Sequence, residues 1–268
     1  MAPSATAHGA YGARARRYET DLCDAQWRLV APFLPPAAAR GRKRSTCLRA
    51  VVDAIVYVLK TGCQWRMLPA DFPPPSTVYG YFRHWAQTGV WDAIHAFFRG
   101  VVRLRDGRSP APSVGIIDSQ TIKTSAQAID GVGYDGGKKV KGRKRHILVD
   151  TLGLLLATHI HPADVQDRDG IRLVCAGLSD HHPVVSTIFA DGGYRGPRAA
   201  QATPVDLIVV ARTEPGFAVL PKRWIVERTF AWLTQNRRLA KDYEGYAATA
   251  HAFVQVAMIR LMLRRLAP

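Results

Sequence analysis

The sequence predicts an α/β (α+β) protein in which an all-helical part precedes a part that mixes strands and helices. Before position 105 the apolar residues recur with a helical period, whereas after position 113 short apolar runs are typical of strands. The stretch RDGRSPAPS at 105–113 is rich in Pro, Gly and Ser and is the strongest break in the chain. We therefore expect a helical domain over 1–108 and a second domain over 109–268.

Composition narrows the class of protein. The 268 residues include 37 Lys and Arg against 21 Asp and Glu, a net charge of +16, and 47% are hydrophobic, which excludes a wholly disordered chain. No apolar run reaches the ~18 residues of a membrane-spanning helix, so we expect no membrane-spanning segment and no membrane partner. The surplus of positive charge favours a polyanionic partner, nucleic acid before an anionic membrane surface. The opening residues 1–17 are predicted to form a flexible basic arm.

The first part predicts helices over 21–33, 48–60, 77–87 and 90–104, bounded by capping residues, Pro or Gly. In the third helix Val78, Phe82 and Trp85 recur at helical spacing and should face the core. That leaves Tyr79 and Arg83 on the opposite side, where they could enter a major groove as in a helix-turn-helix. A plain helical bundle with a solvated Arg83 fits the pattern equally well.

The second part opens with strands. A first strand is expected over 114–118, and 146–150 with 154–160 reads as a hairpin around the turn DTLG. A helix over 167–178, strands over 184–190 and 205–210, and helices over 223–243 and 249–266 complete the second part.

Three acids stand out by their position. Asp118 ends the strand GIID, and Asp191 follows the strand IFA directly before two glycines. Glu227 lies in the long helix, with 35 residues between it and Asp191. Ligands collect at the carboxyl ends of parallel strands, and gathered carboxylates repel one another unless a cation lies between them. Hard oxygen donors select Mg²⁺, with Mn²⁺ as a substitute. Two such ions ~3.5–4 Å apart can activate an attacking oxygen and stabilise the leaving oxygen of a phosphodiester.

Each acid taken alone also has an ordinary explanation. An Asp at a strand end often caps a turn, and Glu227 can pair with Arg223 four residues earlier on the same helix. The three together, in a strongly basic chain, favour the metal site.

The remaining candidate residues are basic. The densest cationic run lies between the first two predicted strands and favours contacts with DNA phosphates, although a solvated loop or an address signal would look the same. On the long helix, a step of four and three residues from Arg223 leads through Glu227 to two further cations, and we expect these three cations to hold phosphates near the metals. The run consists of Lys138, Lys139, Lys141, Arg143, Lys144 and Arg145, and the helical cations are Arg223, Arg238 and Lys241.

Long motifs follow one another through the second part: GIIDSQTIKTS, KKVKGRKRHILVDTLGLLLA, HPADVQDRDG, ADGGYRG and RWIVERTFAWL. The first part contains TGCQWRMLP and STVYGYFRHW. These motifs resemble those of the DDE transposases of bacterial insertion sequences, in particular the IS-five branch of the IS-four superfamily, over about residues 18–266. The resemblance implies a ribonuclease-H-like catalytic domain with a mixed five-stranded sheet, and Asp118, Asp191 and Glu227 take the places of the family's catalytic triad.

One departure concerns the wider superfamily's signature around the Glu. That signature has a Tyr seven residues before the Glu, an Arg four before and a Lys seven after, where this chain has Leu220, Arg223 and Thr234. Only the Arg is kept, so the DNA contacts of the Tyr and the Lys are not expected here.

The resemblance implies a reaction at DNA ends that uses two Mg²⁺ ions. The enzyme would cut at the ends of its insertion sequence and join the 3′-OH ends to a target duplex, as a dimer or larger assembly on DNA. A cytoplasmic, nucleoid-associated location is expected, which fits four cysteines without a C-x-x-C pair. Two alternatives remain open: a ribonuclease-H-like nuclease that cuts without joining, and a DNA-binding derivative that has lost catalysis.

Overall fold

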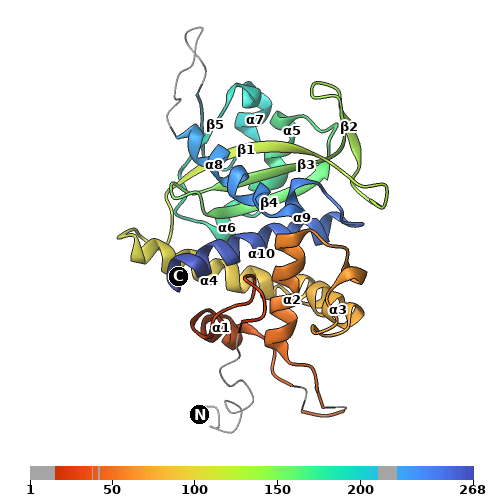
Figure 1. The fold of residues 1–268 in the computed structure, drawn as a ribbon. Helices are drawn as coiled ribbons and strands as arrows, with labels where there is room; N and C mark the ends of the chain where they lie inside the picture. Colours follow the sequence, from red (N-terminus) through yellow and green to blue (C-terminus); the bar gives the residue numbers. More distant parts are fainter. Residues whose placement is uncertain (1–15, 38, 42, 211–221) are drawn as a thin grey trace.

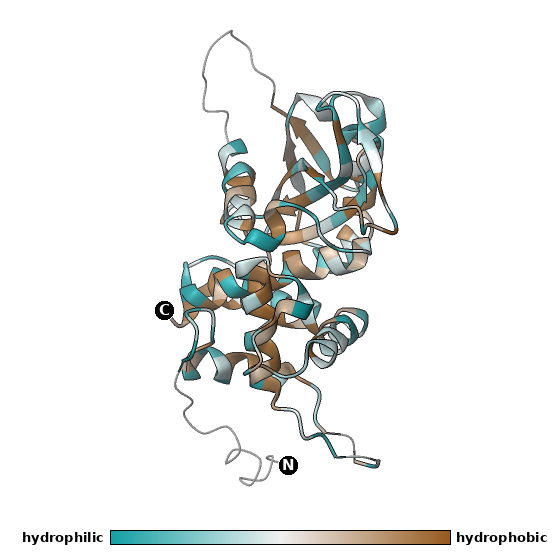
Figure 2. Cartoon of the chain, turned by 45° about the vertical axis from the view of Figure 1, so that its right-hand side comes forward, coloured by the Kyte–Doolittle hydropathy of each residue, from teal (hydrophilic) through white to brown (hydrophobic). Residues whose placement is uncertain are grey.

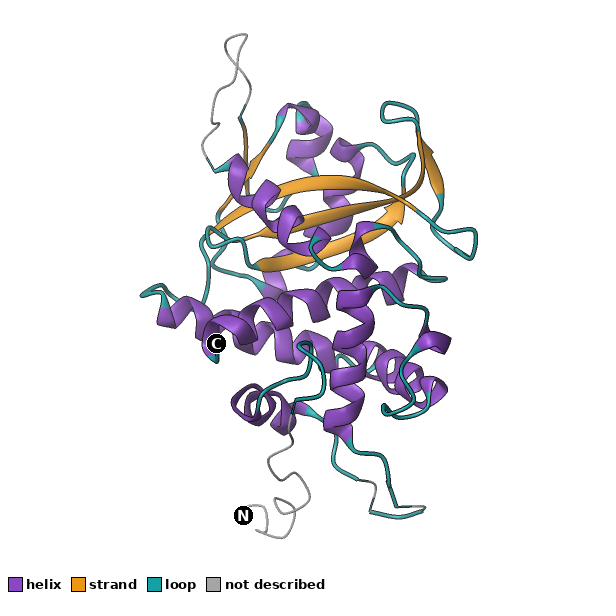
Figure 3. Cartoon of the chain, viewed as in Figure 1, coloured by secondary structure: helices purple, strands orange, loops and turns teal. Residues whose placement is uncertain are grey.

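A computed structural model describes residues 16–268 except 38, 42 and 211–221 (Figure 1). A curled sheet lies above a layer of helices, and the C-terminal helix runs between the two (Figures 1 and 3). Most of the predicted basic arm, residues 1–15, lies outside the described part, as does Leu220. Among the described helices, none combines the length and apolar character that crossing a bilayer requires.

The helices predicted for the first part are confirmed. Val78, Phe82 and Trp85 of the third helix are fully buried, as the apolar spacing predicts. The second helix ends at Gly62, and the fourth begins after Gly89; both glycines have positive φ, the left-handed backbone that favours glycine. The helices are α1 (Asp24–Val30), α2 (Leu48–Thr61), α3 (Pro75–Gln87) and α4 (Val90–Arg105), with 3₁₀ turns at Ala31–Phe33 and Trp65–Met67.

The sheet has the topology expected of a ribonuclease-H-like domain. Its five main strands lie in the order β4-β3-β1-β5-β6. The strand β3 pairs antiparallel with both β1 and β4, whereas β5 and β6 run parallel to β1. The short β2 pairs with the beginning of β3 as a sixth strand. The strands are β1 (Val114–Lys123), β2 (Gly133–Asp135), β3 (Val140–Val149), β4 (Leu155–Pro162), β5 (Thr187–Ala190) and β6 (Asp206–Val209).

Helices cover the sheet and complete the second part. Near the sheet, α5 packs against β3, β4 and β1, while α8 packs against β1 and β3. The helices are α5 (Asp167–Cys175), α6 (Leu178–His181), α7 (Pro197–Gln201), α8 (Arg223–Thr234), α9 (Arg237–Ala240) and α10 (Ala247–Leu266), with a 3₁₀ turn at Gly192–Tyr194.

Several predicted boundaries are wrong. The strand predicted to begin at 146 begins at 140, the strand predicted from 184 begins at 187, and the helix predicted over 167–178 ends at 175. The first strand does not end at Asp118 but continues to Lys123, because its antiparallel pairing with β3 runs on from Asp118↔Ile147 to Lys123↔Gly142. The predicted helix over 223–243 is broken after Thr234, where the side chain of Asn236 donates hydrogen bonds to the carbonyls of the preceding turn.

The two parts of the chain share one hydrophobic core. The C-terminal α10 packs against α4, α2 and α3 on one side and against β4 on the other. Phe82 of α3, Phe253 of α10 and Ile116 of β1 belong to one cluster of buried side chains. Figure 2 shows apolar stretches, in brown, within the helical layer. The sheet and its site are therefore held against the helical layer by buried apolar surface.

Candidate active site

Asp118 and Asp191 lie side by side at one edge of the sheet. The parallel pairing of β1 with β5 ends at Ile116↔Phe189. Asp118 lies two residues beyond Ile116, and Asp191 lies two residues beyond Phe189. The two acids therefore lie at the same level along the neighbouring strands. This edge is where the carboxyl end of β5 leaves the sheet, the place where open α/β sheets bind ligands.

The carboxyl group of Asp118 lies in a poorly solvated, negatively charged setting. Its pKa is raised from 3.8 to about 7, mainly by burial and also by the carboxylates of Asp191 and Asp167, while the N–H of Ser119 and the Arg223 guanidinium lower it. The backbone N–H of Ser119 donates to Asp118 Oδ1 at 2.7 Å. A cation placed at this carboxylate would therefore relieve both the lost hydration and the repulsion.

Asp191 is fixed by the turn that follows it. Its Oδ1 accepts a hydrogen bond from the N–H of Gly193 at 2.8 Å and caps the 3₁₀ turn. A Cβ at Gly193 would lie 3.0 Å from Asp191 Oδ1 and 3.6 Å from Asp167 Oδ2. Gly193, which has no side chain, therefore leaves room for two carboxylates.

Glu227 reaches the same edge from α8. Nη2 of Arg223 lies 3.4 Å from Glu227 Oε1 and 3.7 Å from Asp191 Oδ2, so the guanidinium stands between the two carboxylates. Glu227 is the most solvent-exposed of the three candidate acids, with 57% of its side chain accessible. The helical ion pair considered as an alternative from the sequence is present, and it extends to a third residue.

The donor set suits a hard divalent cation, but the acids are not drawn together as ligands. Within the described residues, no group of three or more His, Cys, Asp or Glu side chains has the arrangement to hold a metal ion. Asp118 and Asp191 are oxygen donors on adjacent strands, and Glu227 is occupied by Arg223.

Sequence reasoning missed Asp167. This residue lies in the first turn of α5. Its Oδ1 also accepts hydrogen bonds from Ser119 Oγ at 2.7 Å and lies 2.9 Å from Lys144 Nζ. The residue after Asp118 is thereby tied to α5, a contact between segments 48 residues apart that no local pattern signals.

The predicted cationic run is not a loop. Val140–Val149 is β3, and the side chains of Arg143, Lys144 and Arg145 are buried, which corrects the expectation that all six cations lie between strands. Arg143 pairs with Asp130 and Asp242, each at 2.9 Å, so its charge serves the fold. The exposed members of the run are Lys138, Lys139 and Lys141, at and beside the β2–β3 turn.

The predicted stripe of helical cations is also corrected. Because the helix breaks after Thr234, Arg238 lies in α9 and does not share a helix face with Glu227. Arg238 is buried, with Nη2 2.6 Å from Glu244 Oε1. Lys241 lies beyond α9, with its Nζ 5.5 Å from the ring centroid of Tyr243. Of the three cations, Arg223 is the one that contacts the candidate acids.

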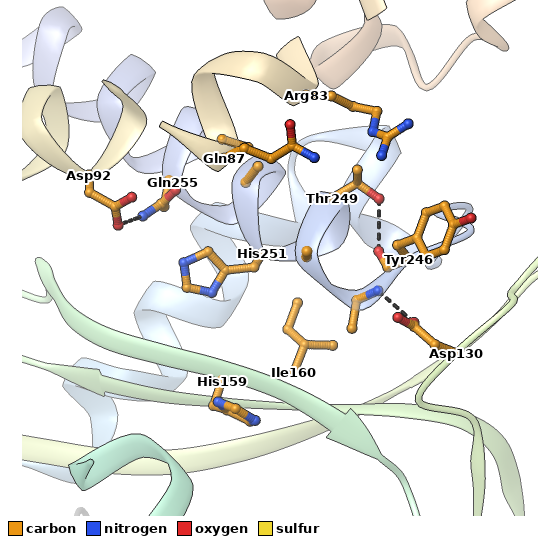
Figure 4. A pocket seen from close by; sticks show the side chains of 14 residues that line it. Arg83, Gln87, Asp92, Asp130, His159, Ile160, Tyr246, Thr249, His251 and Gln255 are labelled. Atoms are coloured by element: carbon orange, nitrogen blue, oxygen red, sulfur yellow. Dashed lines mark hydrogen bonds between the residues drawn. The ribbon is translucent and has the colours of Figure 1, made fainter. Parts of the chain in front are cut away.

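Tyr79 and Arg83 belong to a separate surface. The Arg83 guanidinium lies 5.9 Å from the ring centroid of Tyr79 and 5.8 Å from that of Tyr246. Arg83 borders a cavity of about 570 Å³ between α3, β4 and α10, into which His159 and His251 project from opposite walls (Figure 4). None of the three candidate acids lines this cavity.

Comparison with protein families decides the class of protein. Residues 109–262, more than half of the chain, match the family described as "Transposase DDE domain". The chain belongs to the DDE transposase family. Residues 22–95 of this transposase match a second family, described as "Putative transposase of IS4/5 family". The resemblance found in the sequence motifs is thereby confirmed.

Individual relatives support the same family assignment. The transposase is 38% identical over 106 residues to "Insertion element IS402 uncharacterized 16.2 kDa protein" of Burkholderia cepacia, which covers 37% of this chain and 71% of the relative. It is 35% identical over 128 residues to "Putative transposase for insertion sequence element IS402" of the same organism, covering 43% of this chain and 60% of the relative. No solved structure matches the chain.

Proposed function

We propose that this transposase cuts DNA at the ends of its insertion sequence and joins the freed 3′-OH ends to target DNA by two-metal phosphodiester chemistry. The observation that carries the proposal is the shared edge of Asp118 and Asp191 on two parallel strands, with Glu227 linked to Asp191 through Arg223. Membership of the DDE family supports the same reaction.

Asp118 and Asp191 would hold the divalent cations, Mg²⁺ or Mn²⁺, and Glu227 would complete the second site. When bound, the ions activate the attacking oxygen and offset charge on the leaving oxygen. The chain's own groups set the geometry: the Ser119 N–H fixes the Asp118 carboxylate, and the Gly193 N–H fixes that of Asp191. Arg223 orients Glu227 and would exchange part of that contact for a DNA phosphate.

The partners follow from the reaction. The substrate is double-stranded DNA, both the element ends and the target, and the helical part over 1–108 would contribute to DNA binding. Because two ends must be joined to one target, we propose that a homodimer or larger assembly forms on DNA. Its place of action would be the cytoplasm, at the nucleoid.

The test is strand transfer in vitro with the full chain, Mg²⁺, and a duplex whose end is taken from the inverted repeats that flank the gene. Asp118→Asn, Asp191→Asn and Glu227→Gln are each expected to lower the rate by about a hundredfold or more. Circular dichroism and DNA affinity serve as controls for folding. A folded variant that keeps full activity overturns the assignment of that residue.

The products separate the proposal from its alternatives. Joined products support the transposase reaction. Nicked products without joining, with both Mg²⁺ and Mn²⁺, would make the protein a nuclease instead. DNA binding with neither product would identify a derivative that has lost catalysis.

A further inference from the structure

A cationic cleft lies beside the candidate acids, on the side of β1 that faces α5. Successive side chains of β1 alternate between the two faces of the sheet, so Asp118 turns toward Arg223 of α8 while Ser119 turns toward Asp167 of α5. On the α5 side, the β2–β3 turn, the start of α5 and the turn at Gly192–Tyr194 enclose a cleft of about 410 Å³. We call it the α5 cleft.

The α5 cleft carries a net positive charge, because four cationic side chains line it against two carboxylates. Its two carboxylates are already engaged: Asp135 accepts from Thr121 Oγ1 at 2.6 Å and from two backbone N–H groups of the turn, and Asp167 binds Ser119 and Lys144. Among the described residues, the three cationic side chains of the cleft other than Lys144 form no ion pair within 4.0 Å. These cations are Lys138, Arg168 and Arg195.

Contacts of the buried Lys144 hold the side of the cleft that β3 and the start of α5 form. Lys144 is buried, and its ammonium binds the carbonyl of Val165 at 2.8 Å as well as the carboxylate of Asp167. These contacts hold β3 against the start of α5. Arg168 directly follows Asp167, which Lys144 holds in place. Gly193, which has no side chain, forms the border between the α5 cleft and Asp191.

We propose that the α5 cleft binds backbone phosphates of the DNA strand that passes over Asp118 and Asp191, with Arg168 and Arg195 as the main contacts and Lys138 at the rim. This inference rests on the proposed function and extends it: Arg223 would hold the strand on the α8 side of the cut, and the α5 cleft would hold it on the other side. Guanidinium groups suit this task because their N–H groups match two phosphate oxygens at once.

Phosphate contacts position DNA but carry no sequence information. Each cation that binds a phosphate also releases condensed counterions, which makes affinity fall with salt. The loss of Arg168 or Arg195 should therefore weaken binding to an element end and to an unrelated duplex by the same factor.

The experiment compares Arg168→Gln and Arg195→Gln with Arg172→Gln, in full chains that also carry Asp118→Asn so that DNA is not consumed. Arg172 is a matched control, because it is exposed on the same α5 but borders a different cavity, against α4. Fluorescence anisotropy over a range of KCl concentrations gives Kd and its salt slope for both duplexes.

For Arg168→Gln and Arg195→Gln we expect severalfold weaker binding to both duplexes and a salt slope smaller by about one, with the melting temperature unchanged. Arg172→Gln should keep the slope of the parent. If all three variants share one Kd and one slope, the proposal is wrong. It is also wrong if inorganic phosphate raises the melting temperature, Arg195→Gln removes that rise, and DNA affinity stays unchanged, because the cleft would then bind a free anion.

Failure of this inference is distinguishable from failure of the proposed function. Unchanged DNA binding by Arg168→Gln and Arg195→Gln, with strand transfer still abolished by Asp118→Asn, overturns the α5 cleft alone. Full strand transfer by Asp118→Asn overturns the catalytic assignment and leaves the binding result standing.

Discussion

Nη2 of Arg223 lies 3.4 Å from Oε1 of Glu227, one turn apart on α8. The same atom lies 3.7 Å from Asp191 Oδ2, so a single guanidinium bridges acids that come from a strand end and from a helix. Under the proposed function, the bridge places positive charge between two of the proposed metal ligands. Arg223 is therefore both a link that positions Glu227 and a competitor for the space between the carboxylates.

Replacing Arg223 should separate these two roles. In Arg223→Gln we expect strand transfer at saturating Mg²⁺ to fall about tenfold or more, because Glu227 loses its orientation. The Mg²⁺ concentration for half-maximal rate should fall or stay unchanged, because a competing cation is removed. A titration of rate against Mg²⁺ measures both. A higher Mg²⁺ requirement with an unchanged maximal rate would contradict this account.

The raised pKa of Asp118 predicts how stability depends on pH. Burial, with Asp191 and Asp167 nearby, raises this pKa from 3.8 to about 7, so between these values the folded chain holds a proton that the unfolded chain has lost. The metal-free protein should therefore lose stability as pH rises from about 4 to 7, by at most about 4 kcal/mol from this group.

Urea unfolding at several pH values, in chelator, measures this dependence. Asp118→Asn should remove the part of the slope that belongs to Asp118, and Mg²⁺ should reduce it by favouring the charged carboxylate. An identical slope in the parent and in Asp118→Asn would refute the prediction.

The two neighbouring glycines after Asp191 should differ sharply. A Cβ at Gly193 would lie 3.0 Å from Asp191 Oδ1, whereas one at Gly192 meets nothing within 4 Å. Gly193→Ala should displace the carboxylate by a few tenths of an ångström and lower strand transfer about tenfold, with stability changed by less than about 1 kcal/mol. Gly192→Ala is the control and should keep near-normal activity. Equal rates for both variants would argue against a fixed Asp191.

The cationic run should divide into structural and surface residues. Arg143→Met leaves Asp130 and the buried Asp242 without their partner and should destabilise the protein by about 3–5 kcal/mol. Lys141→Gln, on an exposed side chain, should change stability by less than about 0.5 kcal/mol. Thermal melts of the two variants decide between this division and a uniformly solvated run, in which both changes would be mild.

Local patterns predicted what local forces control. The apolar spacing of Val78, Phe82 and Trp85 predicted the buried face of α3, and Gly62 and Gly89 marked the ends of helices. Such signals act within a turn or two of the chain, so a single sequence carries them. The break after Thr234 escaped because Asn236 ends the helix through its side chain, without a Gly or Pro.

The cationic run shows where local reading fails. Clustered positive charge between two predicted strands predicted contacts with DNA phosphates, yet Arg143 is buried because Asp130 and Asp242, 13 and 99 residues away, neutralise it. Asp167 was missed as a neighbour of the site for the same reason, since its contact with Ser119 spans 48 residues.

The sequence by itself determined the helical and strand segments that local spacing encodes, the positive charge that calls for a polyanion, and the motifs whose family assignment the comparisons confirm. Only the tertiary structure decided which charges remain free: it buried Arg143, set Arg223 between two acids, and left Arg168 and Arg195 open beside them. The reason is physical, because the fate of a charge depends on partners brought close by folding, and those partners lie far away along the chain.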